Sequence, residues 1–123
     1  MKISCGTDII EIDRIKSCIE DIGDKFLNTI YTEREIEYCE SRKSNKYQHY
    51  AARFAAKEAI FKAISTRFGP LSNWKDFEVL NDEHGKPKVF INAQIPNLED
   101  IDISISHCKL YAVANVIAIY KEN

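Results

Sequence analysis

The chain has 123 residues, of which 45% are hydrophobic and 29% are charged, and its formal net charge is −2 at pH 7. This length holds one domain with one core, and this hydrophobic fraction excludes a disordered chain. The slightly negative charge argues against a general affinity for nucleic acid or for an anionic membrane surface.

The first predicted strand runs from Met1 to Ile12 and is interrupted by Gly6. Asp8 lies in this otherwise apolar run on the same side as Ile10, where an unpaired carboxylate is costly once water is excluded. We therefore expect Asp8 to have a partner elsewhere in the fold. The alternative is that Asp8 faces solvent from the polar side of the strand.

Two shorter helical signals follow. Asp13 is expected to cap a helix that ends at Gly23, and the stretch Phe26–Tyr31 is interpreted as a connector with apolar anchors. The residues Thr32–Glu35 form a capping box, which predicts a further helix that ends near Ser41.

A long helix is predicted from about Tyr47 to Arg67, with Gly69 and Pro70 as its stop. At about 100° per residue, one side of this helix collects small or aliphatic residues, namely Ala52, Ala56, Ala59, Ile60 and Ala63. That side allows the helix backbone to lie close to a sheet. The opposite side collects Phe54, Glu58, Phe61 and Lys62. Charged groups between phenyl rings indicate the wall of a polar site, although Glu58 and Lys62 also fit a surface ion pair of about 0.2–0.5 kcal/mol.

Four strands are predicted after this helix, near Phe77–Leu80, Lys88–Ile91, Ile101–His107 and Tyr111–Tyr120. A loop longer than two residues joins the first two strands and a short turn joins the last two, so each pair is expected to form a hairpin. A strand, then helices, then four strands predicts an α+β fold with the helices packed on one face of a mainly antiparallel sheet.

The four cysteines, Cys5, Cys18, Cys39 and Cys108, show neither a CxxC pair nor the cysteine–histidine spacing of a zinc site. Each lies in an apolar or helical pattern, which predicts four buried thiols. Since the sequence also shows no signal peptide, disulfide framework or long apolar segment, we expect a cytoplasmic protein.

Asp8 and Glu58 are the two acids expected in apolar surroundings. Mg²⁺ accepts one or two carboxylates because it keeps several waters and takes phosphate oxygens from a substrate. Lys62, Lys57 and Arg53 on the long helix supply positive charge for phosphate groups. His107, at a strand end, either donates to a phosphate or caps a turn. The chain has no Walker loop or GxGxxG motif, so we do not expect nucleotide binding through a glycine loop.

Three motifs stand in an order and at separations that resemble one enzyme family: Gly6–Ile9, Arg53–Ala63 and Ser104–His107. Together they resemble the holo-[acyl-carrier-protein] synthases, the short bacterial type of 4′-phosphopantetheinyl transferase, and the similarity runs nearly end to end. Enzymes of this family move the phosphopantetheine arm of coenzyme A onto a serine of apo-acyl carrier protein in fatty acid biosynthesis. Adenosine 3′,5′-bisphosphate is the leaving product.

The resemblance implies that Asp8 and Glu58 bind Mg²⁺ and that Lys62 contacts the phosphates and stabilises developing charge. It implies that Glu58, directly or through an ordered water, takes the serine proton. The implied coenzyme A contacts are Arg53, Lys57, Lys62, Ser65, Gly85, Pro87, Ser106 and His107.

The resemblance also implies a homotrimer with each active site between neighbouring subunits. The implied contacts of the acyl carrier protein, on the first helix and just beyond it, are Arg14, Cys18 and Lys25. Two stretches depart from the family pattern. Asp21 and Asp24 stand where the family tends to continue with basic residues, and Ser65–Gly69 stands in place of a glycine-rich turn.

Two other classes of function remain to be separated from the transferase. A non-catalytic binding module would show no thermal shift with coenzyme A and Mg²⁺, whereas a ligand at 100 times its Kd stabilises a protein by about 2.7 kcal/mol. A nucleic-acid-binding protein would show a steep salt dependence of affinity, which the net charge of −2 disfavours.

Overall fold

The computed structural model describes residues 1–68 and 73–122, and in the long helix it describes side chains as far as Ile64. The described residues form five strands, four α-helices and two short 3-10 helices. In chain order these are β1 (Lys2–Glu11), α1 (Ile12–Ile22), α2 (Asp24–Ile30), α3 (Glu33–Ser41), η1 (Lys43–Asn45), α4 (Lys46–Phe68), η2 (Trp74–Asp76), β2 (Phe77–Asn81), β3 (Pro87–Ile91), β4 (Leu98–His107) and β5 (Tyr111–Tyr120).

The strands form two antiparallel sheets. β5 is the central strand of the larger sheet, in the order β1-β5-β4, and β2 pairs with β3 in a separate hairpin. The predicted α+β fold and both predicted hairpins are confirmed. The strands form two sheets because β3 and β4 lie side by side without a hydrogen-bonded ladder between them.

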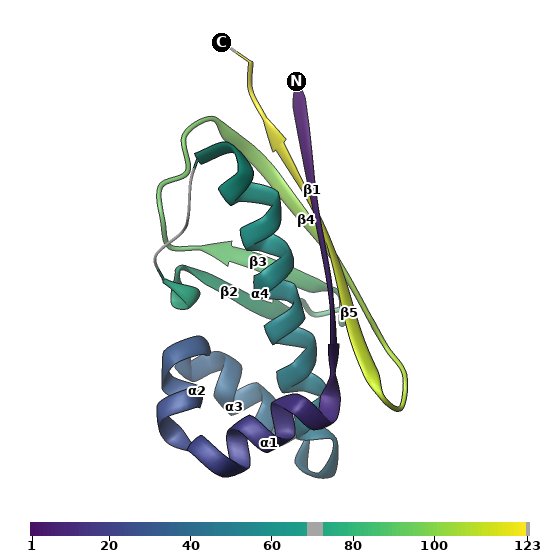
Figure 1. Ribbon diagram of the computed structural model, residues 1–123. Coiled ribbons are helices and arrows are strands. Elements are labelled where there is room, and N and C mark those ends of the chain that lie inside the picture. Colours follow the sequence, from purple (N-terminus) through teal and green to yellow (C-terminus); the bar gives the residue numbers. More distant parts are fainter. Residues whose placement is uncertain (69–72, 123) are drawn as a thin grey trace.

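Helix α4 lies along the larger sheet, with α1, α2 and α3 gathered at one end of it and both chain termini at the other (Figure 1). The predicted small-residue side of α4 is buried, as the exposures of Ala52, Ala56, Ala59, Ile60 and Ala63 show. At Gly6 the backbone of β1 touches that side so closely that a Cβ would stand 1.9 Å from the carbonyl oxygen of Ala59. The close approach fixes β1 against α4, and therefore fixes Asp8 relative to Glu58.

Two predictions about the N-terminal helices were wrong. α1 begins at Ile12, and its N-cap residue Glu11 makes no capping side-chain bond, so Asp13 lies inside the first turn. The stretch Phe26–Tyr31, interpreted as a connector, belongs largely to α2 because its apolar side chains stand at helical spacing and pack into a core. The capping box of Thr32–Glu35 is confirmed in both directions.

The prediction of four buried thiols was also wrong. Cys39 is buried and Cys18 is half-buried, whereas Cys5 and Cys108 are exposed. Cys5 lies on the face of β1 that points away from α4, and Cys108 lies in the turn between β4 and β5. The predicted helix stop at Gly69 and Pro70 falls outside the described residues. Across the described part, no helix combines the length and the apolar composition that a membrane crossing needs.

Candidate active site

Asp8 on β1 and Glu58 on α4 line the same pocket, whose volume is about 360 Å³. Because side chains alternate along a strand, Asp8 points to the helix side of β1, and 15% of its side chain is exposed. This placement excludes the alternative of a solvent-facing Asp8. The remaining lining residues come from β1, α1, α2 and α4, namely Ile9, Ile10, Arg14, Ile15, Cys18, Phe26 and Phe54.

The charged side chains at this carboxylate pocket are Asp8, Glu58, Arg14 and Lys62. Lys62 Nζ donates to Asp8 Oδ1 at 3.2 Å and to the Thr7 carbonyl oxygen at 2.9 Å. Burial raises the pKa of Glu58, the negative charge of Asp8 raises it further, and Lys62 lowers it. Two carboxylates close enough for the charge of Asp8 to raise the pKa of Glu58 favour a cation between them.

The carboxylate pocket fits a divalent metal ion that prefers oxygen. Among the described residues there is no cluster of three or more His, Cys, Asp and Glu side chains arranged to hold a metal. A site with two carboxylates therefore lacks the ligands of a closed zinc or calcium cage. It suits Mg²⁺, which takes its other ligands from water and from substrate phosphates.

The predicted carrier-protein contacts lie at or near this pocket. Arg14 and Cys18 line it from α1, and Lys25 is exposed on α2. The acidic departures Asp21 and Asp24 are also exposed. Basic and acidic side chains therefore share this surface of α1 and α2.

Arg53 belongs to a second group of residues on another side of α4. At about 100° per residue it points roughly 140° away from Glu58. Its side chain is buried, its guanidinium lies 4.3 Å from the ring centroid of Tyr38, and it donates to Asn81 Oδ1 at 3.5 Å. Its Nε has no hydrogen-bond partner within the described residues.

Positive charge is concentrated around this group. Burial, followed by the charges of Arg53, Arg42 and His107, lowers the pKa of His49 to about 4. His107 at the end of β4 and Arg53 therefore both lie near His49. His49 was missed in the sequence, although it stands one helical turn before Arg53.

The remaining predicted ligand contacts are distributed differently. Gly85 and Pro87 flank Lys86, whose Nζ donates to Asp102 Oδ1 at 3.2 Å and so holds the β2–β3 loop against β4. Ser106 and His107 are exposed further along the same strand. The side chain of Ser65 lies outside the described part of the chain, and so do residues 69–72.

Lys57 does not reach either group. Its side chain is fully buried, and Nζ donates to Glu35 Oε1 at 2.6 Å, to the Ile30 carbonyl at 2.7 Å and to the Trp74 carbonyl at 3.2 Å. Since an ammonium has three donors, none is left for a phosphate. The expected coenzyme A contact at Lys57 is therefore not available in this structure.

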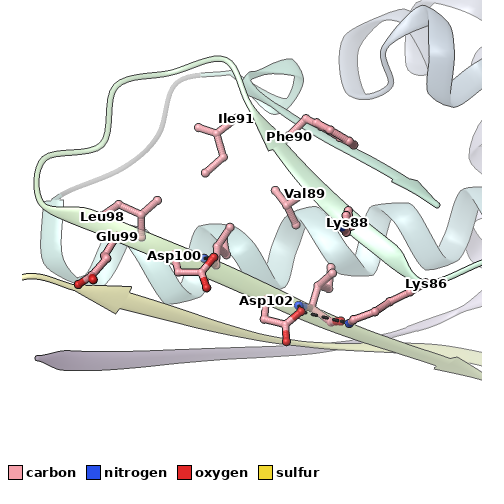
Figure 2. A pocket seen from close by; sticks show the side chains of 11 residues that line it. Lys86, Lys88, Val89, Phe90, Ile91, Leu98, Glu99, Asp100 and Asp102 are labelled. Carbon is pink, nitrogen blue, oxygen red and sulfur yellow. Dashed lines mark hydrogen bonds and ion pairs between the residues drawn. The ribbon is translucent and has the colours of Figure 1, made fainter. Parts of the chain in front are cut away.

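A larger cleft, of about 620 Å³, lies between β3 and β4, and neither Asp8 nor Glu58 lines it. Figure 2 shows Val89 and Ile91 on the side of β3 that faces β4, and the link from Lys86 to Asp102 at the narrow end. The cleft is the gap between the two sheets, and none of its lining residues lines the carboxylate pocket.

The chain is similar to a family of known transferases along most of its length. Residues 4–116 match the model of the 4′-phosphopantetheinyl transferase superfamily. A holo-[acyl-carrier-protein] synthase of Ruminiclostridium cellulolyticum is 49% identical over an alignment that covers 95% of this chain and 92% of the relative. The same enzyme of Protochlamydia amoebophila is 46% identical, with 93% of this chain and 95% of the relative covered.

Solved structures of similar enzymes have the same fold. The ACPS–CoA complex of Chronobacterium ammoniagenes superposes with a TM-score of 0.84 at 26% identity, over 99% of this chain and 100% of that chain. A holo-(acyl-carrier-protein) synthase from Bacillus anthracis in complex with CoA (3′,5′-ADP) superposes with a TM-score of 0.76 at 37% identity, over 94% of each chain.

Proposed function

This chain belongs to the 4′-phosphopantetheinyl transferase superfamily, and from that membership we propose that it transfers 4′-phosphopantetheine from coenzyme A to a serine of apo-acyl carrier protein. Adenosine 3′,5′-bisphosphate is released, and the modified carrier serves fatty acid biosynthesis in the cytoplasm. Residues 1–123 act as one transferase domain. The observation that carries the proposal is the pair Asp8 and Glu58, which meet in one pocket from a strand and a helix.

In this proposal Asp8 and Glu58 hold Mg²⁺, which when bound neutralises charge on the pyrophosphate of coenzyme A. Lys62 lies beside Asp8 and contacts the phosphates, so that negative charge developing on the leaving bisphosphate is stabilised. Glu58 takes the proton of the carrier serine, directly or through an ordered water.

Coenzyme A also needs partners for its 3′-phosphate and nucleotide, and the second group supplies them. Arg53 brings positive charge and His107 an imidazole, and Arg53 Nε is a donor with no partner among the described residues. Gly85, Pro87 and Ser106 line the approach from the β2–β3 loop and from β4. Arg14, Cys18 and Lys25 form the docking surface for the acyl carrier protein beside the carboxylate pocket.

The active form is a homotrimer, with each site built between two subunits. Two observations support this arrangement. The carboxylate pocket and the Arg53 group point to different sides of α4, so a neighbouring copy can unite them. The outer sheet face, formed by Ile3, Cys5, Ile9 and Ile117 on the side away from α4, leaves Ile3 58%, Ile9 63% and Ile117 46% exposed. Exposed Thr7 and Asn115, which hydrogen-bond to each other, divide this face into two parts. Exposed apolar side chains gathered on one face in this way favour an interaction surface.

The test is mass spectrometry of an apo-acyl carrier protein after incubation with this protein, coenzyme A and Mg²⁺. We expect a mass gain of one phosphopantetheine arm. Asp8→Ala and Glu58→Ala should each lower the rate by at least about 10²-fold while the protein stays folded. Glu33→Ala, which removes an exposed acid on α3 outside the site, is the matched control and should keep the rate. Near-normal transfer by either alanine variant at saturating Mg²⁺ would contradict the assignment.

A further inference from the structure

The buried ion pair Glu35–Lys57 joins five parts of the fold. Both side chains are fully buried, with 2.6 Å between Lys57 Nζ and Glu35 Oε1. Lys57 also bonds the carbonyls of Ile30 at the end of α2 and Trp74 in η2. Glu35 Oε2 accepts from the backbone N–H of Val79 in β2 at 2.7 Å. The pair therefore ties α2, α3, η2 and β2 to α4.

A buried pair of this kind is weak evidence for stability, because the cost of removing two charges from water can exceed their attraction. Such a pair fixes how the surrounding elements are arranged, because few other arrangements would satisfy each of its buried donors and acceptors. The arrangement that depends on Lys57 is the position of Trp74, whose carbonyl oxygen accepts a hydrogen bond from Lys57.

Trp74 connects Lys57 to the wall of the carboxylate pocket. Its ring stacks on Phe54 with 5.3 Å between centroids and meets Phe61 edge-on at 4.9 Å. Phe54 lines the carboxylate pocket together with Glu58. Phe54 and Phe61 stand four residues before and three residues after Glu58, so both are neighbours of its side chain on the helix surface.

We propose that Lys57, held in place by Glu35, is a positioning residue for the carboxylate pocket. Its bond to the Trp74 carbonyl sets the Trp74 ring, and that ring holds Phe54 and Phe61 on either side of Glu58. The aromatic wall restricts Glu58 to orientations in which it faces Asp8, and so raises the affinity of the two carboxylates for a divalent cation. This inference rests on the proposed function, in which these carboxylates hold the cation.

The test uses the folded full-length protein and two readouts that do not depend on transfer activity. Trp74 is the single tryptophan of the chain, so its fluorescence reports on the wall alone. Mn²⁺ serves as the cation probe, with its affinity measured from the paramagnetic resonance signal of the free ion. Lys57→Met alone would leave Glu35 charged and buried, so the informative variant is the double change Glu35→Gln with Lys57→Met.

We expect the double variant to fold, to show more quenching of Trp74 by acrylamide, and to bind Mn²⁺ about tenfold more weakly, as is typical when a supporting shell is lost. Trp74→Ala leaves the ion pair in place and should weaken Mn²⁺ binding to a similar degree. Glu40→Gln combined with Lys46→Met is the matched control: it makes the same two changes in another ion pair between α3 and α4, without changing a contact of Trp74. It should change neither Mn²⁺ affinity nor the fluorescence.

Three outcomes overturn the inference. Unchanged Mn²⁺ affinity in Trp74→Ala contradicts it even if the double variant does not fold. Unchanged Trp74 quenching or unchanged Mn²⁺ affinity in a folded double variant reduces the pair to a structural role. A wild-type protein that binds no Mn²⁺ overturns the proposed cation site itself and this inference with it. That last result is distinguishable because it appears before any substitution is made.

Discussion

His49 shows how strongly the surroundings of one residue change its chemistry. It stands one turn before Arg53 on α4, its ring meets Tyr38 at 5.4 Å, and positive groups surround it. Burial, and then the charges of these neighbours, therefore disfavour a positive charge on the His49 ring in the folded protein. The same crowding makes this region attractive to an anion.

We predict that His49 is neutral at pH 7 and titrates near pH 4, where the lowered pKa lies, instead of near the ordinary value of 6.5. Between these values the unfolded chain binds more protons than the folded one, so the free energy of unfolding falls as the pH drops from 6.5 to 4. Proton NMR of the imidazole measures the midpoint. His49→Gln should flatten the pH dependence of denaturant unfolding across this window. A wild-type midpoint near 6.5 would contradict the prediction.

Lys57 and Lys62 show what residue type and spacing leave open. Both stand on the predicted helix near Glu58, and their charge alone assigns both to phosphate binding. In the fold, Lys62 reaches β1 at the pocket, whereas Lys57 is buried against Glu35, which lies 22 residues earlier in the chain. The helix and its small-residue face follow from local periodicity. The partner of each lysine depends on which distant element packs beside it. The residues around each lysine in the sequence do not show which element that is.

At the scale of elements, the contact of β1 with α4 determines the geometry of the pocket. The stripe of alanines predicted a close neighbour for α4, and the neighbour is Gly6. β1 comes from the start of the chain and pairs with β5 from its end, so its position depends on contacts more than 100 residues apart in sequence. Alternation along β1 predicted the side that Asp8 takes but not the strand that β1 pairs with.

Gly6→Ala should destabilise the protein strongly. The added Cβ would meet the Ala59 carbonyl oxygen at 1.9 Å and the Ala63 backbone nitrogen at 2.9 Å, and a helix backbone cannot move aside as a flexible side chain does. We expect the free energy of unfolding to fall by about 3 kcal/mol, the upper part of the range for overpacking. Denaturant unfolding measures it. Glu11→Ala, an exposed change on the same strand, should stay within about 0.5 kcal/mol. A loss as small for Gly6→Ala would show that β1 is not held this tightly.

The gap between β3 and β4 explains why the strands form two sheets. Lys86 Nζ lies 3.4 Å from the Ile103 carbonyl oxygen, so this carbonyl and the N–H of the same residue point toward β3. Asp102 Oδ1 accepts that N–H at 2.9 Å, and Asp100 Oδ1 accepts the N–H of Ile101 at 2.9 Å. The edge of β4 is therefore capped by its own side chains, which is one way proteins protect a free strand edge.

Asp100→Ala combined with Asp102→Ala should expose this edge and promote self-association through β4. Removing two acids takes the formal net charge from −2 to 0, so the control must change charge equally. Glu83→Ala combined with Glu99→Ala does so without removing a backbone cap. We expect sedimentation velocity at high protein concentration to show larger species for the aspartate pair than for the glutamate pair. Equal association in the two variants would attribute the effect to net charge alone.

At the scale of the whole molecule, the two groups of functional residues are separated within one chain. Asp8 and Glu58 face α1, whereas Arg53 faces Tyr38 on α3 and Asn81 on β2. The exposed outer sheet face offers a surface on which copies can assemble. In a cyclic assembly every interface joins one side of a subunit to the other side of its neighbour. In the proposed trimer, a complete site therefore takes its carboxylates from one subunit and its His107 from the next.

This arrangement predicts that two inactive variants restore activity when they assemble together. Asp8→Ala lacks the cation site, and His107→Ala lacks part of the coenzyme A site, so each alone should transfer almost nothing to apo-acyl carrier protein. Trimers are then reassembled from equal amounts of the two variants. A site in such a trimer is complete when its carboxylates come from a His107→Ala subunit and its histidine from an Asp8→Ala subunit. Random mixing gives about one quarter of wild-type activity, because each condition is met at half of the head-to-tail interfaces. Transfer assays before and after co-refolding measure the recovery. If activity does not recover in mixed assemblies, both groups must act within a single subunit.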